Sequence, residues 1–177
     1  MRADKFIVTE ASVDDAAFLA VYGAESFIEA YQETLPIGAL KAYTRKVFSE
    51  ESIRREIKQC AADYQVCIGT AGEQYGYSKF IGSEPPSCVA SGATVELQRL
   101  YIKKECRGEG IGRRLLEAGE HKARQREVRV VWLRVWAGNH SAIEVYRKWD
   151  FSVCGEESYR VGDETRMVLV MTKELAY

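Results

Sequence analysis

The stretch CRGEGIGRRLLEAGEH, residues 106–121, has glycine at three alternate positions, Gly108, Gly110 and Gly112, and runs directly into helix-forming residues. This spacing matches neither the G-x-G-x-x-G loop of dinucleotide folds nor the G-x-x-x-x-G-K-[ST] loop of nucleoside triphosphatases. Glycine nevertheless lets the backbone approach a ligand, and a following helix presents free N–H groups in its first turn. The stretch therefore predicts either an anion-binding loop or an ordinary flexible turn into a helix.

The flanking segments favour the first alternative. TVELQRLYI (94–102) precedes the stretch, and VRVVWLRVW (128–136) follows a predicted helix over residues 110–126. Both flanking segments are rich in β-branched and aromatic residues, and two strands joined by a helical crossover pair in parallel. Open α/β sheets bind ligands beyond the carboxyl ends of such strands, which is where the glycine loop leaves the first strand.

The remaining periodicity predicts one mixed α/β domain over residues 1–177. Helices are expected over residues 12–31, 38–48, from 49 onward, and 140–149. On the helix over 110–126, the pattern places Ile111 and Leu115 inward and Glu120 mostly outward. Further strands are expected over 5–10, 64–71 and 73–81, and two more near the end are joined by a Gly162-Asp163 turn.

The composition of the chain limits the classes of partner that it can bind. With 25 basic and 26 acidic side chains among 177 residues, the net charge of −1 gives no global attraction to nucleic acid or to an anionic membrane. No apolar run approaches the roughly 18 residues of a membrane span, and the first residues lack a signal-peptide core, so a cytoplasmic protein is expected. Five cysteines without a C-x-x-C pair and two isolated histidines predict no metal site.

Two motifs resemble those of the GCN5-related N-acetyltransferases. The first, [Q/R]-x-x-G-x-[G/A], is matched within LYIKKECRGEGIG by Arg107, Gly110 and Gly112. The second, N-x-x-A-x-x-x-Y, is matched within NHSAIEVYRKWDF (139–151) by Asn139, Ala142 and Tyr146. One position departs from the pattern, because Asp150 stands where a glycine commonly precedes the phenylalanine. Aspartate can adopt the left-handed conformation at modest cost, so the departure concerns a local turn.

The resemblance implies a fold and a cosubstrate. The fold is a mixed, mostly antiparallel sheet of about six to seven strands, flanked by about four helices, with one parallel pair splayed around acetyl-CoA. The backbone of the strand before the loop would pair with the pantetheine arm, the loop would hold the pyrophosphate, and Asn139 would contact either group. The implied cofactor-binding residues are Leu100, Tyr101, Ile102, Arg107, Gly108, Glu109, Gly110, Ile111, Gly112 and Asn139.

Acetyl transfer from a thioester to an amine requires a neutral amine, a polarised carbonyl and a protonated leaving thiolate. An alkylamine has a pKa of about 10.4, so a base or a desolvating site must take its proton. The N–H of Leu100 or a neighbour could polarise the carbonyl. The resemblance assigns the acid to Tyr146, whose helical spacing with Ile143 and Trp149 equally fits packing. Glu96 is either an outward, solvated carboxylate or a water-linked general base.

The acceptor is suggested by Glu25 and Glu29, which share a helix face with Phe18, Val21 and Tyr22. The two carboxylates are either solvated, or they point inward and pair with a cationic substrate. The chain is also loosely similar to bacterial spermidine/spermine N-acetyltransferases, which implies a polyamine. The alternatives are acetylation of a protein α-amino group or lysine, and a CoA-binding module without catalysis. Oligomeric state stays open, with a homodimer as one option.

Overall fold

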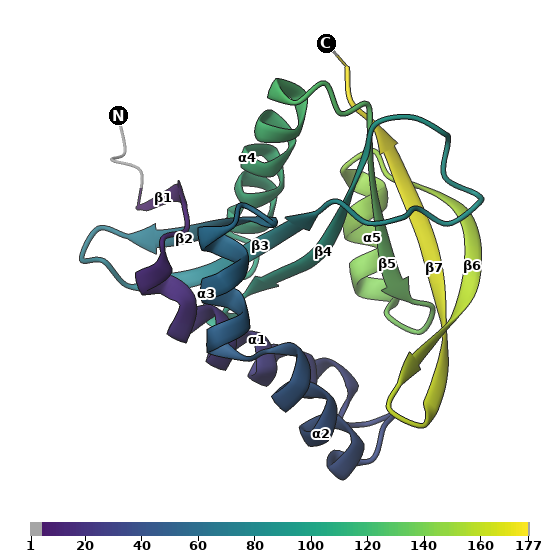
Figure 1. The fold of residues 1–177 in the computed structure, drawn as a ribbon, viewed down its shortest axis with the longest axis horizontal. Helices are drawn as coiled ribbons and strands as arrows, with labels where there is room; N and C mark the ends of the chain where they lie inside the picture. Colours follow the sequence, from purple (N-terminus) through teal and green to yellow (C-terminus); the bar gives the residue numbers. More distant parts are fainter. Residues whose placement is uncertain (1–4, 177) are drawn as a thin grey trace.

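The computed structural model describes residues 5–176, and its centre is a seven-stranded sheet (Figure 1). The strand order is β1-β2-β3-β4-β5-β7-β6. Among the strands formed by residues 5–176, only β4 and β5 pair in parallel, so the predicted mixed sheet with one parallel pair is confirmed. The strands are β1 (Phe6–Glu10), β2 (Ala62–Gly69), β3 (Gln74–Ile81), β4 (Thr94–Ile102), β5 (Val130–Trp136), β6 (Ser152–Val161) and β7 (Glu164–Glu174).

Five α-helices and two 3₁₀ helices are formed by the described residues. Ser12 begins the first helical region, because its side chain and that of Asp15 satisfy each other's backbone N–H groups in a capping box. No helix between residues 5 and 176 is long and apolar enough to cross a membrane. The helices are η1 (Val13–Asp15), α1 (Ala16–Tyr31), α2 (Ile37–Val47), α3 (Glu50–Lys58), η2 (Lys104–Cys106), α4 (Ile111–Gln125) and α5 (His140–Lys148).

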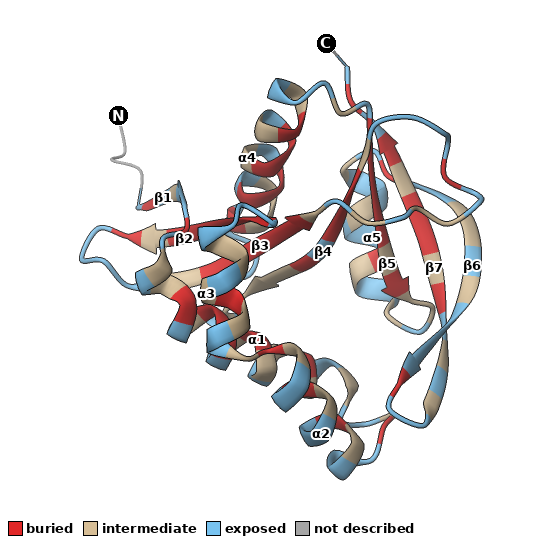
Figure 2. Ribbon diagram, viewed as in Figure 1, coloured by how far each residue is buried: buried red, intermediate tan, exposed pale blue. Residues whose placement is uncertain are grey.

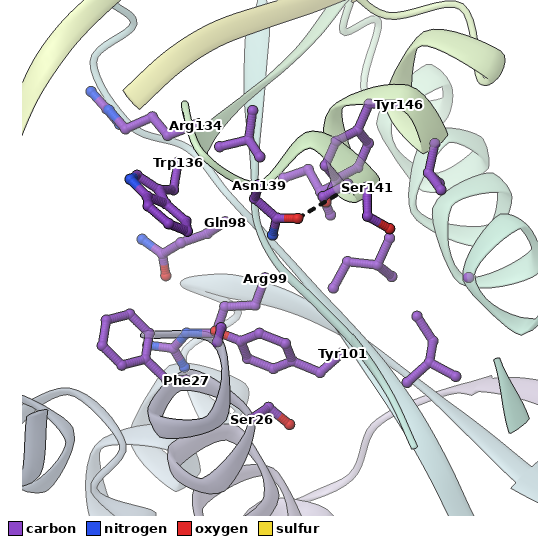
Figure 3. A pocket seen from close by; sticks show the side chains of 18 of the residues that line it. Ser26, Phe27, Gln98, Arg99, Tyr101, Arg134, Trp136, Asn139, Ser141 and Tyr146 are labelled. Atoms are coloured by element: carbon purple, nitrogen blue, oxygen red, sulfur yellow. Dashed lines mark hydrogen bonds between the residues drawn. The ribbon is translucent and has the colours of Figure 1, made fainter. Parts of the chain in front are cut away.

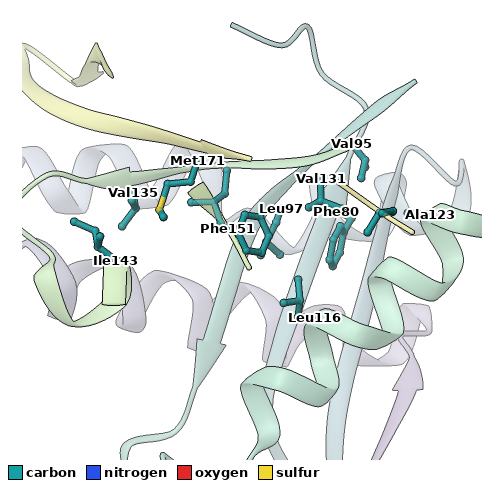
Figure 4. Close-up of a cluster of buried hydrophobic side chains, with 12 residues drawn as sticks. Phe80, Val95, Leu97, Leu116, Ala123, Val131, Val135, Ile143, Phe151 and Met171 are labelled. Carbon is teal, nitrogen blue, oxygen red and sulfur yellow. The ribbon is translucent and has the colours of Figure 1, made fainter. Parts of the chain in front are cut away.

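Buried residues lie in the strands and in the helices that cover the sheet (Figure 2), and apolar clusters occupy both faces of the sheet. On one face, α4 and α5 pack over β3, β4, β5 and β7 through a cluster that includes Leu116, Phe80 and Leu97 (Figure 4). On the other face, α1 and α3 cover β2 and β3 through Leu19, Ile53 and a set of ring and branched side chains that includes Tyr64, Val66 and Tyr77. The sheet therefore separates two halves of the molecule.

Glu120 on α4 corrects the predicted orientation of that helix. Its side chain is only 3% exposed, and Oε1 lies 2.5 Å from Lys173 Nζ on β7. Arg124, one turn later, reaches Oε2 at 3.4 Å. A charge that periodicity would place outward is thus buried and paired, because a lysine on a distant strand supplies the partner.

The parallel pair is short, and this feature creates the site. Strands β4 and β5 pair only from Thr94↔Val130 to Glu96↔Trp132. On its other side β4 stays paired with β3 as far as Ile102, with a bulge that leaves Gln98 without a partner. Within residues 5–176, no strand pairs with the β5-facing edge of β4 beyond Glu96. The carboxyl-terminal half of β4 therefore offers free backbone groups to a ligand.

Gly119→Ala is expected to lower the free energy of unfolding by about 1–3 kcal/mol. A Cβ at Gly119 would lie 2.0 Å from Cε2 of the buried Phe80, so α4 or the ring must shift. Gly38→Ala is the matched control, because a Cβ on this exposed α2 residue meets nothing within 4 Å. The control should gain roughly 0.5–1 kcal/mol. Urea unfolding followed by circular dichroism measures both, and equal shifts would contradict the packing argument.

Candidate active site

A cleft of about 930 Å³ opens where β4 and β5 separate. Figure 3 shows Asn139, Ser141 and Tyr146 along one wall and Ser26 and Phe27 along the other. The cleft continues past the amino end of α4. Its two halves therefore lie on opposite sides of the separated strands, one against α4 and α5 and the other against α1 and α2.

The glycine loop forms one end of this cleft. Gly108 has φ +86° and Gly110 has φ +81°, and a Cβ at either residue would meet nothing within 4 Å. These glycines are thus required by the left-handed backbone and not by crowding. Gly110 is the N-cap of α4, and since it has no side chain it cannot accept a hydrogen bond from the first N–H groups of the helix. The loop has the features of an anion site at a helix N-terminus.

The cofactor-binding residues predicted for the loop do not all reach the cleft. Arg107, Gly108, Gly110, Ile111 and Gly112 line it, whereas Glu109 does not. The Glu109 carboxylate is instead paired with Lys5, at 3.2 Å. Only the backbone of Glu109 can therefore serve the predicted role, because its side chain is directed away.

Gly112 has a packing role that its motif position did not reveal. A Cβ there would lie 3.0 Å from Cη2 of Trp149 and 3.2 Å from Cδ1 of Ile102. The missing side chain lets α4 approach α5 and the end of β4 closely.

The predicted pantetheine-binding residues alternate between the two halves of the cleft. Leu100 packs with the cluster beneath α4 and α5, and Ile102 lies with Ile111 of α4. Tyr101 instead joins the cluster between α1 and α2. All three line the cleft, and their binding to pantetheine stays a prediction.

Asn139 begins α5 by accepting a hydrogen bond from the N–H of Ala142 at 3.1 Å. The sequence also fits a capping box between Ser141 and Glu144, but Glu144 pairs with Arg147 and the box does not form. Asn139 Oδ1 is thus occupied as a cap, although the residue lines the cleft.

Asp150 adopts the left-handed conformation that its position predicted, with φ +70°. The N–H of Phe151 donates to the carbonyl of Tyr146, and that of Asp150 to the carbonyl of Arg147. These two bonds end α5 in a Schellman motif. The departure from the family pattern is therefore accommodated without altering the turn.

Tyr146 lines the cleft on the α5 side. Its ring makes edge contacts with Trp149 and Phe151, at centroid distances of 6.0 Å and 5.7 Å. Burial raises the pKa of Tyr146 to about 12. Tyr146 can therefore both pack against its neighbours and act as an acid, because the ring is held in place while the phenol stays protonated at neutral pH.

Glu96 is buried, at 5% exposure, so the outward, solvated orientation is wrong. Arg134 Nη1 lies 2.9 Å from Oε1, and the Ser83 hydroxyl donates to Oε2 at 2.7 Å. Arg134 also pairs with Glu157 and stacks on Trp132. The carboxylate faces the cleft in a fixed orientation, held by two neighbouring side chains.

The inward orientation predicted for Glu25 and Glu29 is wrong. Both residues are exposed, and the buried face of α1 carries Ala16, Leu19, Ala20, Gly23 and Phe27. Glu29 reaches the rim of the cleft, where Lys104 Nζ lies 2.6 Å from its Oε1. Glu25 does not line the cleft. The face was misassigned because Phe18 and Val21, taken as inward, flank the buried stripe.

Several cleft residues were missed by sequence reasoning. Arg134 interrupts the otherwise apolar strand β5, and this interruption was the available signal, whereas Arg99 follows Glu96 and Gln98 in a strand of mixed polarity. The aromatic wall could not be found, because its members come from distant elements: Phe27, Tyr31, Tyr43, Phe48, Trp136 and Tyr159.

Comparisons with known proteins show relatives of this chain and of its fold. An N-acetyltransferase from the pepI 3′ region of Lactobacillus delbrueckii subsp. lactis is 24% identical over 169 residues, covering 96% of each chain. Streptothricin acetyltransferase of Streptomyces lavendulae is 30% identical over 93 residues, 52% of this chain and 46% of that protein. The fold is shared with the PaiA N-acetyltransferase of Thermoplasma acidophilum, solved with coenzyme A, at a TM-score of 0.77 and 20% identity over 96% and 99% of the two chains.

The model of the acetyltransferase (GNAT) family matches residues 24–151, which include the glycine loop, Glu96 and Tyr146. This match spans well over half of the sequence. The chain therefore belongs to the acetyltransferase (GNAT) family and is an acetyl-CoA-dependent N-acetyltransferase.

Proposed function

We propose that the chain transfers the acetyl group of acetyl-CoA to a small primary amine by direct attack in a ternary complex. The observation that carries this proposal is the continuous cleft at the separation of β4 and β5. An anion-binding loop and Tyr146 lie in one half, and Glu96 with an aromatic wall lies in the other. Both substrates can therefore be present together, and no covalent enzyme intermediate is needed.

The residues of the first half fit acetyl-CoA. The loop from Arg107 to Gly112 offers backbone N–H groups at the start of α4, which suits a pyrophosphate. The free edge of β4 beyond Glu96 offers amide groups at the spacing of a strand, which suits the two amides of pantetheine. When bound, acetyl-CoA supplies an acetyl group activated as a thioester. Leu100 and its neighbours would donate backbone N–H groups that polarise the carbonyl.

The second half favours a small acceptor over a protein. The hydroxyls of Tyr43 on α2 and Tyr159 on β6 lie 3.2 Å apart and join the two walls. Arg166 of β7 also bonds to the carbonyl of Thr34. A polyamine gains no support from the cleft, because Glu25 is outside it and Glu29 is paired with Lys104.

Two side chains would move protons in this scheme. Glu96 would attract the ammonium group and accept its proton, directly or through a water molecule, since each carboxylate oxygen keeps a lone pair beyond its bonds to Arg134 and Ser83. Tyr146 would donate from its protonated hydroxyl to the leaving thiolate.

A thiol-release assay with acetyl-CoA and a panel of primary amines tests the proposal, together with calorimetric titration of CoA. Gly110→Ala is expected to weaken CoA binding about tenfold, because alanine in the left-handed conformation costs roughly 1–2 kcal/mol. Gly38→Ala, outside the cleft, should bind CoA as the wild type does. Absence of both CoA binding and thiol release in the wild type would overturn the proposal.

A further inference from the structure

Arg99 lies in the acceptor half of the cleft with an unused hydrogen-bond donor (Figure 3). The residue is only 7% exposed, and its guanidinium carbon lies 4.1 Å from the centre of the Phe48 ring. Nη2 donates to the carbonyl of Val47 at 3.3 Å. Nη1 is buried and has no hydrogen-bond partner within the described chain. A buried guanidinium N–H without an acceptor destabilises the folded protein, and a ligand that accepts a hydrogen bond from it would remove this cost.

The carboxylates near Arg99 are paired with other groups and do not neutralise its positive charge. Lys79, the cross-strand neighbour of Arg99, is also buried and lies 2.9 Å from Glu56. The same Glu56 carboxylate accepts the hydroxyl of Tyr64 at 2.6 Å. Glu96 is committed to Arg134 and Ser83. Among residues 5–176, no carboxylate forms an ion pair with Arg99, so one buried positive charge at the cleft lacks a counter-ion.

Several aromatic rings line the cleft together with Arg99. The rings of Phe27 and Tyr43 are 4.8 Å apart, and those of Tyr31 and Trp136 are 6.1 Å apart. Both pairs line the cleft. Such walls favour a ligand with an apolar or aromatic side chain, and the guanidinium of Arg99 would be the polar group that orients it.

We propose that Arg99 binds a carboxylate of the acceptor, so that the substrate class is a primary amine carrying a carboxylate and an apolar or aromatic body, as in an amino acid. This inference rests on the proposed acetyl transfer. The planar guanidinium can bond both oxygens of a carboxylate, and burial strengthens those bonds. The amine then lies toward Glu96, on the same side of the separated strands.

Matched acceptors that differ only in the carboxylate test the inference: phenylalanine with phenethylamine, and tryptophan with tryptamine. At equal concentrations of neutral amine, the wild type should show a kcat/KM about 30-fold higher for the amino acid of each pair, as expected for hydrogen bonds to a charged group. In Arg99→Met the ratio should fall to about 1. Arg99→Lys, which keeps the charge but loses the planar fork, should give an intermediate ratio.

The melting temperature separates binding from a structural role. Methionine keeps the contact with Phe48 and removes an unpaired buried charge, so the free Arg99→Met protein should melt no lower than the wild type. A lower melting temperature with the 30-fold ratio retained would overturn the inference. CoA binding with transfer only to the decarboxylated amines, or to neither member, would also overturn it while leaving the CoA site intact. Loss of both CoA binding and all thiol release would mean that the proposed function itself has failed.

Discussion

Tyr146→Phe is expected to lower kcat about 1000-fold, with the KM for acetyl-CoA changed by no more than roughly threefold, within the range that general acid catalysis contributes. Phenylalanine keeps the edge contacts with Trp149 and Phe151 and removes only the hydroxyl. The loss therefore reports the proton or hydrogen bond that the phenol supplies to the leaving group. Steady-state kinetics by thiol release measure both constants.

The pH dependence follows from the direction of the pKa shift. Burial raises the pKa of Tyr146 to about 12, so the hydroxyl is protonated throughout pH 6–10 and would be lost as an acid only above that range. An ordinary thiol has a pKa of about 8.5, which is below that of the buried phenol. Full transfer of the proton therefore requires that burial in the cleft also raises the pKa of the leaving thiol. The ratio of wild-type to mutant turnover should thus be constant from pH 6 to pH 10.

Tyr75→Phe is the matched control, because Tyr75 lies outside the cleft and packs edge-on against Phe6. Its turnover should equal that of the wild type. Unchanged turnover in Tyr146→Phe over the whole pH range would remove Tyr146 from the acid role and leave only its packing.

The sequence predicted the parts of the fold that depend on local signals. Glycine spacing before a helix predicted the loop, and the left-handed φ values of Gly108 and Gly110 explain why those positions are glycine. The parallel pair followed from two apolar strands joined by a helix. Asp150 was identified as a substitute for glycine because aspartate tolerates the same backbone conformation.

The features that the sequence did not reveal depend on contacts between distant elements. The family resemblance implied a splayed parallel pair, but the position at which β4 separates from β5, after Glu96, depends on how both strands twist in the sheet, and no residue in either strand signals it. The burial of Glu96 depends on Arg134 from the next strand and Ser83 from a loop. Arg99 was overlooked because its importance lies in a missing partner. That a buried cation lacks a counter-ion within the described chain can be recognised only when its surroundings are known.

Glu96→Gln is expected to lower kcat/KM about 1000-fold at pH 7, with a deficit that shrinks as the pH rises. Glutamine keeps the size of the side chain and can still accept from Arg134, which also retains Glu157. It cannot take a proton from an ammonium group. The mutant must therefore use the fraction of amine that is already neutral, and this fraction grows about tenfold per pH unit until the pH approaches the pKa of the amine.

Two controls isolate the carboxylate from its surroundings. Ser83→Ala removes the hydrogen bond to Oε2, and Glu157→Gln removes the other partner of Arg134, while Glu96 stays in place in both. Each control should lose far less activity than Glu96→Gln, and its deficit should not depend on pH. If Glu96→Gln itself showed a deficit that stayed constant from pH 7 to pH 10, Glu96 would only position Arg134. The amine would then lose its proton to solvent before binding, because a side chain that accepts the proton must change the pH profile when it is replaced.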